Sequence, residues 1–179
     1  VMKSQEKGWL GNMLEWGRRR QLATCEILYG NAVAVAREPA FFRDHGVADN
    51  VDGRFDALAL VVALVMRRLK SCGDEGAALS QQLFDAMFSD MDLSLREMGA
   101  GDIGVSKRVR VMAEAFMGRL DAYATALDDK DRDALAAAIG RNLLRGEVPA
   151  DAQLVDFVLS LETRLSTLDD ETLLAGGLG

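Results

Sequence analysis

The chain has 179 residues, 49% of them hydrophobic, with 21 basic and 28 acidic side chains and a formal net charge of −7. This length predicts one domain whose core is large enough to fold without disulfides or a structural metal. The single histidine, His45, excludes multi-histidine zinc and di-iron sites. The acidic balance excludes a free-standing nucleic-acid binder, so we expect no DNA partner.

The first predicted element is a helix from Trp9 to Arg19, inside an amphipathic basic segment that we assign to residues 1–21. Two tryptophans beside an arginine triplet are typical of an interfacial membrane helix, because indole rings lie at headgroup depth and arginines meet anionic lipid. A terminal helix docked on its own domain fits equally well, since the segment also carries acidic residues. Both interpretations stay open, and the candidate membrane contacts are Trp9, Trp16, Arg18, Arg19 and Arg20.

Residues 22–179 are expected to form one helical domain. It begins with a helix over Leu22–Arg37, followed by a short helical turn that opens at Pro39. Cys25 lies in the first of these helices and Cys72 in a later one, and no signal peptide is recognised ahead of them. We therefore expect both to be packing thiols in a reducing compartment.

A long helix is predicted next, with cap oxygens around Asn50 and an end at Gly73. Its apolar run Ala57–Met66 is the most hydrophobic in the chain. Ten apolar residues cannot span a bilayer, which needs about twenty. The run therefore predicts the buried central helix of a soluble bundle. Arg54, near the start, is expected either to be buried against a carboxylate or to extend along the surface.

The stretch from Leu83 to Tyr123 predicts a helical hairpin at the centre of the fold. Apolar residues recur at steps of three and four up to Met98, and Gly99 is expected to end this first helix in a left-handed conformation. A second apolar stripe begins at Val105 and defines the returning helix.

Five of the eight methionines in the chain fall in this hairpin. Thioether side chains repack easily, so surfaces that bind varied apolar partners use them often. A stripe at helical spacing is more often core, and we expect most of these side chains to be buried. They are Met87, Met91, Met98, Met112 and Met117.

Beyond a charged link, a helix over Leu135–Leu144 is expected to end at Gly146, and Pro149 is expected to open the next helix. A last short helix, Asp170–Ala175, is expected to fray into the terminal GGLG. No stretch alternates with the period of a strand. The predicted fold class is therefore all-α, a single globular bundle of about seven or eight helices around a central helical hairpin.

Two further patterns resemble ligand sites without meeting their requirements. Residues 99–104, GAGDIG, match a dinucleotide fingerprint, but a helix precedes them where a strand is needed. The acidic runs that start at Asp90 and Asp129 lack the glycine that a calcium loop needs at its sixth position. We therefore expect no metal, no nucleotide and no other cofactor.

The segment DMDLSLREMGAGDIGVSKRV, followed by MAEAFMGR, resembles the signature of the ubiquinol–cytochrome c chaperone family. GVADNVDGRFDALAL upstream and RNLLRGEVPADAQLVDFV downstream support the resemblance, which covers roughly Leu28 to Gly176. It implies a non-catalytic assembly factor that holds newly synthesised cytochrome b and promotes assembly of the cytochrome bc1 complex. The partner-binding residues implied by the matching motifs are Asp52, Arg54, Asp90, Asp92, Arg96, Glu97, Met98, Asp102 and Lys107.

The resemblance also implies a client, cytochrome b, and a small partner protein. Ribosome contact, known in mitochondrial relatives, is left open because this chain is acidic. The expected location is cytoplasmic, with peripheral contact at the inner membrane, on the matrix side if the source is eukaryotic. The alternative function from a different class is a small-molecule binder with a ligand among the methionines of the bundle.

Overall fold

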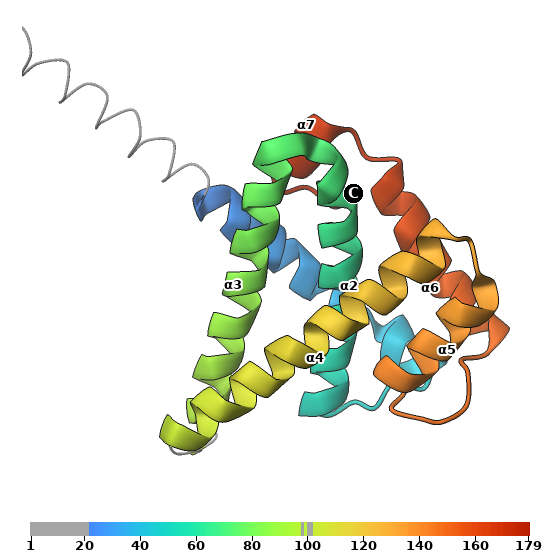
Figure 1. Cartoon of the computed structure of the whole chain (residues 1–179), viewed down its shortest axis with the longest axis horizontal. Coiled ribbons are helices and arrows are strands. Elements are labelled where there is room, and N and C mark those ends of the chain that lie inside the picture. The colour runs from blue at the N-terminus through green and yellow to red at the C-terminus, as the bar shows by residue number, and fades with distance from the viewer. Residues whose placement is uncertain (1–21, 98, 100–101) are drawn as a thin grey trace, which may run out of the picture.

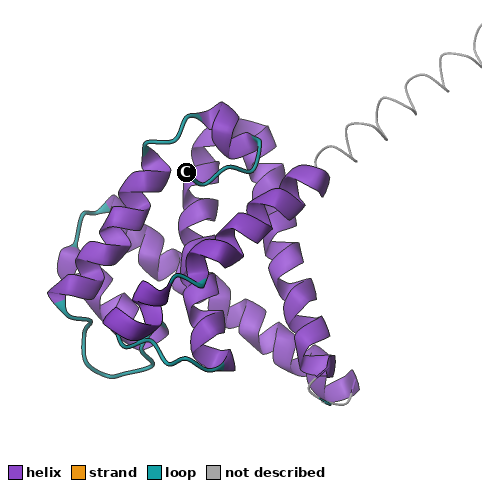
Figure 2. Ribbon diagram, turned by 180° about the vertical axis from the view of Figure 1, so that it is seen from behind, coloured by secondary structure: helices purple, strands orange, loops and turns teal. Residues whose placement is uncertain are grey.

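The computed structural model describes residues 22–97, 99 and 102–179, and in that part of the chain it contains helices and no strand (Figures 1 and 2). Residues 22–36 are helical. The other elements are a π-helical turn η1 (Ala40–Asp44), α2 (Val51–Leu69), a 3₁₀ turn η2 (Lys70–Cys72), α3 (Gly73–Glu97), α4 (Asp102–Asp128), α5 (Arg132–Asn142), α6 (Ala152–Ser166) and α7 (Asp170–Leu174). The all-α prediction is confirmed, while six labelled α-helices are slightly fewer than the seven or eight expected.

Helix α2 is the centre of the core, and α3, α4 and α6 pack around it (Figure 1). Twelve of its 19 residues are buried. Its first turn is capped by Asn50, whose Oδ1 accepts a hydrogen bond from the Gly53 amide at 2.9 Å. A Cβ on Gly53 would lie 2.0 Å from the Ala48 carbonyl oxygen. Only glycine therefore lets the preceding loop pack this closely on the helix.

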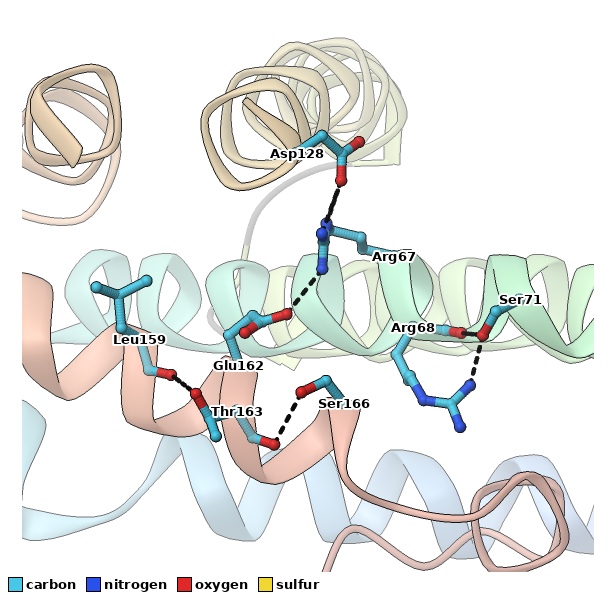
Figure 3. Close-up of polar contacts among 8 residues, drawn as sticks. All are labelled: Arg67, Arg68, Ser71, Asp128, Leu159, Glu162, Thr163 and Ser166. Carbon is cyan, nitrogen blue, oxygen red and sulfur yellow. Dashed lines mark hydrogen bonds and ion pairs between the residues drawn. The ribbon is translucent and has the colours of Figure 1, made fainter. Parts of the chain in front are cut away.

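The C-terminal end of α2 is tied to three other elements by two arginines. Arg67 lies between Asp128 of α4, at 2.7 Å, and Glu162 of α6, at 2.9 Å (Figure 3). Arg68 pairs with Asp170 of α7 at 2.6 Å and also donates to a backbone carbonyl ahead of α7. Cations at this end also complement the helix dipole.

Helices α3 and α4 form the predicted hairpin, and they converge at the turn in the lower left of Figure 1. Gly99 ends the first helix with φ +86°, as expected. The rings of Phe84, Phe88 and Phe116 pack against one another with centroid separations of 4.7–5.9 Å. This aromatic cluster fixes how the two helices of the hairpin lie against each other.

The methionine prediction is wrong for the described residues. Only Met87 is buried, Met91 and Met112 are half-buried, and Met117 is 51% exposed. Met98 lies outside the described residues. The core side of the hairpin is thus formed mainly by phenylalanine and leucine together with Met87, and the other described methionines of the hairpin lie partly or largely at the surface.

The C-terminal third corrects two expectations. Pro149 lies in a loop, and α6 begins after Asp151, whose carboxylate accepts a hydrogen bond from the Leu154 amide at 2.8 Å. The terminal residues do not fray. Leu178 is only 4% exposed, and Asn31 donates to the Gly176 carbonyl at 2.8 Å. This tail therefore belongs to the core.

The predicted N-terminal membrane helix, with Trp9, Trp16 and the arginine triplet 18–20, lies outside the described residues. In the part that is described, no helix is both long and apolar enough to cross a bilayer. Cys25 is buried, and burial raises the pKa of its thiol, as expected for a packing residue. Cys72 is half-buried beside Arg68.

Candidate functional site

An open groove forms where the N-terminal end of α2 meets the turn of the α3–α4 hairpin. It has a volume of about 570 Å³. Each of the three helices contributes two residues one turn apart, and the start of α2 adds polar groups at one end. The lining residues are Asn50, Val51, Asp52, Phe55, Met91, Leu95, Gly99, Arg108 and Met112.

Beneath one wall of the groove lies a buried ion-pair network centred on Asp56. This carboxylate has no exposed side-chain surface. It accepts hydrogen bonds from Arg119 of α4 at 2.6 Å and from Arg145, in the α5–α6 loop, at 2.5 Å. Arg119 also lies over the ring of Phe55, 5.9 Å from its centroid. A buried carboxylate with two such partners fixes α2 to α4 and to the loop.

Arg145 connects this network to the groove. Its Nε and Nη2 bind Asp56, while Nη1 lies 3.2 Å from a carboxylate oxygen of Asp52, which lines the groove. The hydrogen bond to Asp56 raises the pKa of the Arg145 guanidinium, so the side chain stays charged. Its backbone adopts φ +54°, which is uncommon for a residue other than glycine. At this wall of the groove, the negative charges of Asp52 and Asp56 are thus balanced by the positive charges of two arginines.

The two residues predicted from the upstream motif have different surroundings. Asp52 lines the groove and is 54% exposed, but it is paired with Arg145. Arg54 points away from the core and pairs with Asp49 at 2.8 Å, with both side chains more than half exposed. Of the two alternatives, burial against a carboxylate is therefore wrong for Arg54. The buried acid in this segment is Asp56.

The residues predicted on α3 make local contacts outside the groove lining. Asp90 accepts a hydrogen bond from the Tyr29 hydroxyl at 2.7 Å, which joins α3 to the helix over residues 22–36. Burial, and then this hydrogen bond, raise the pKa of Tyr29. Asp92 and Arg96 form an ion pair one helical turn apart at 2.5 Å.

Glu97 and Lys107 are exposed on either side of the hairpin turn. Met98 lies outside the described residues, and so does the side chain of Asp102. The structure therefore gathers several predicted residues near one end of the hairpin. Of those with described side chains, it places only Asp52 in the groove itself.

Most of the groove was not identified from the sequence. The apolar lining residues look like core positions, because each continues a helical stripe. Arg119 and Arg145 lie 63 and 89 residues from Asp56, so no local pattern links them. One available signal is Asp56, an acid directly before the long apolar run of its helix, since a buried acid requires a partner.

The described residues contain no cluster of three or more His, Cys, Asp or Glu side chains that could hold a metal ion. A small, partly open cavity beside α2 and α6 measures only about 10 Å³. Such a space holds about one water molecule and is too small for an organic ligand. The half-buried methionines line the open groove instead.

Residues 43–178 match the family described as ubiquinol-cytochrome C chaperone. The fold is similar to the crystal structure of the Cbp3 homolog from Brucella abortus, with 37% sequence identity, a TM-score of 0.81 and coverage of 93% of each chain. A search of curated proteins returned no significant match.

Proposed function

The chain belongs to the ubiquinol–cytochrome c chaperone family, and from this membership we propose that it binds newly synthesised cytochrome b and promotes assembly of the cytochrome bc1 complex. Family membership implies a non-enzymatic role. The match over residues 43–178 is the observation that carries the proposal, because it includes the hairpin, the groove and the buried network.

We propose that the charged residues around the hairpin turn and the start of α2 form part of the client surface. The exposure of Arg54, Glu97 and Lys107 supports this assignment, because exposed charges can meet a partner without unfolding the domain. The ion pairs of Asp52 and of Arg96 give these two side chains a structural role as well. The full set is Asp52, Arg54, Asp90, Asp92, Arg96, Glu97, Met98, Asp102 and Lys107.

Charge reversal tests this surface. Lys107→Glu is expected to change the free energy of unfolding by about 0.5 kcal/mol or less, as is usual for an exposed charge. Arg96→Glu also removes the ion pair with Asp92, and its expected cost is about 1 kcal/mol. Asp102→Lys is the third variant. Each is expected to reduce co-purification of cytochrome b and the level of bc1 complex in cells. Phe116→Ala is the control for unfolding, because removing this buried ring is expected to cost about 3–5 kcal/mol. Normal bc1 levels in all three stable variants would reject the assignment.

We further propose that residues 1–21 contact the membrane peripherally. Deleting residues 1–20 is expected to abolish sedimentation with anionic vesicles and to leave the melting temperature nearly unchanged. Added salt is expected to weaken binding, because about 1 kcal/mol per basic residue comes from screened electrostatics. A large drop in melting temperature with vesicle binding intact would instead identify a docked structural helix.

The family resemblance also suggests binding to a small partner protein and contact with the ribosome, and both stay proposals. The alternative of a small-molecule binder has no observation in its favour, because the half-buried methionines line an open groove. A melting shift on adding a small apolar compound, without capture of cytochrome b, would revive it.

A further inference from the structure

The groove at the hairpin turn offers apolar surface in a form suited to one turn of a helix. Val51 and Phe55, Met91 and Leu95, and Arg108 and Met112 are each separated by four residues, so each pair spans a single helical turn. Three such pairs surround one depression. A depression lined in this way can accept large apolar side chains that project from one face of a partner helix.

The lining is adaptable and open to solvent. Met91 and Met112 are half-buried, and unbranched thioethers can repack around apolar side chains of different shape. Val51 is 54% exposed at the edge. A small-molecule site usually encloses most of its ligand, whereas this groove leaves one side of its occupant uncovered. These features favour a segment of a protein over a free small molecule.

The charged residues of the groove indicate which kind of protein segment would fit it. Among the residues that the structure describes, the groove lining includes one acid, Asp52, and one guanidinium, Arg108. Asp52 is already paired with Arg145. Arg108 is exposed and makes no ion pair or hydrogen bond through its side chain with any residue that the structure describes. The groove therefore presents an unpaired positive charge beside apolar surface, which complements an acidic group on the occupant.

We infer that this groove docks one apolar helical segment of the client protein, and that Arg108 pairs with an acidic side chain next to the apolar face of that segment. The inference rests on the proposed function and adds to it a location and a recognition chemistry. The apolar contacts supply most of the attraction. The ion pair at the rim sets the orientation of the segment in the groove.

Site-specific photo-crosslinking in cells tests the location. p-Benzoylphenylalanine in place of Val51 places the probe at the groove, with 54% of the native side chain exposed. The same probe in place of Met117 is the matched control, because Met117 is 51% exposed and lies in another depression, beside the C-terminal end of α2. The expected result is a cytochrome b adduct from position 51 with little or none from position 117.

A charge swap tests the recognition chemistry. Arg108→Glu is expected to lower the yield of the position 51 adduct about tenfold, the change that accompanies loss of one charge-assisted contact. Arg110→Glu is the matched control, because this side chain is also exposed and makes only a long, exposed ion pair with Glu114 at 3.8 Å. Neither change is expected to shift the melting temperature. Equal losses in both variants would overturn the role of Arg108.

A gene deletion shows whether a negative crosslinking result rejects only docking in the groove or also the proposed function in bc1 assembly. If deletion lowers bc1 levels and cytochrome b co-purifies, but the adduct forms equally at both positions or only at position 117, the groove is not the docking site and the proposed function stands. If deletion leaves bc1 levels normal and no cytochrome b is captured, both are overturned.

Discussion

The two ends of α2 are held by similar chemistry arranged in opposite ways. At its N-terminal end α2 contributes the acids, Asp52 and Asp56, and other elements contribute the arginines. At its C-terminal end α2 contributes Arg67 and Arg68, and other elements contribute the acids. Both arrangements follow the helix dipole, because acids lie toward its positive end and cations toward its negative end.

The ends differ in how far their charges are buried and in what lies beside them. Asp56 has no exposed side-chain surface, whereas the acids at the C-terminal end are 22–64% exposed. The N-terminal end also borders the open groove, whose lining combines polar groups with half-buried methionines. We infer that the C-terminal end serves mainly to hold the bundle together, while the N-terminal end combines a rigid support with a surface that is free to bind.

Breaking the buried network is expected to produce the largest effect. Asp56→Ala leaves two arginines without their shared partner, so the free energy of unfolding is expected to fall by about 3–5 kcal/mol. Urea titration followed by circular dichroism measures this loss. Asp56→Asn retains the shape and part of the hydrogen bonding, and it is expected to lose less. If Asp56→Ala is as stable as the parent, the network does not support the groove.

Removing an ion pair at the C-terminal end of α2 is expected to lower the free energy of unfolding by less. Arg67→Ala leaves Glu162 partly buried without its partner, and the expected loss is about 1–3 kcal/mol. The same titration measures it, with Arg54→Ala as the control, since Arg54 forms only an exposed pair with Asp49. A loss at Arg67 that exceeds the loss at Asp56 would reverse the proposed difference between the two ends.

The smallest effect is expected for the pH dependence of stability that Asp170 contributes near the C-terminal end of α2. The hydrogen bond from Arg68 holds the pKa of Asp170 below its ordinary value. A carboxylate with a lowered folded-state pKa adds stability above its unfolded pKa of about 3.9, and this stability is lost as pH falls through the folded value. In the variant Asp170→Asn, stability measured between about pH 5 and pH 2 should therefore fall less steeply than in the parent. Identical slopes would show that this exposed pair contributes nothing.

The elements that sequence patterns predicted well are those set by neighbouring residues. The continuous apolar run of α2, the apolar stripes of α3 and α4, the cap at Asn50 and the left-handed Gly99 are all set by residues close together in the sequence, and the structure confirms them. The start of α6 differs from the prediction because the helix begins after Asp151, whose side chain caps it, while Pro149 lies in the preceding loop. The packed tail was missed because its burial depends on Asn31, 145 residues away.

The groove could not be predicted from the spacing of apolar residues alone. A helical stripe indicates which side chains face inward, but it does not indicate whether a neighbouring helix covers them. Leu95 and Met91 belong to one stripe, yet Leu95 is 3% exposed and Met91 is only half-buried, so the stripe alone does not indicate which of the two a neighbouring element covers. The unpaired state of Arg108 is likewise a property of the assembled fold.

The separation of Asp56 from Arg145 also has a consequence for the order of events during translation. The carboxylate is synthesised 89 residues before the arginine that binds two of its oxygens. At about 5–20 residues per second, roughly 5–20 s pass between the two on the ribosome. Over that interval α2 carries an acid that lacks its full set of partners, so the N-terminal half of the domain cannot complete its core. The nascent chain is therefore expected to become resistant to protease only after the α5–α6 loop has emerged.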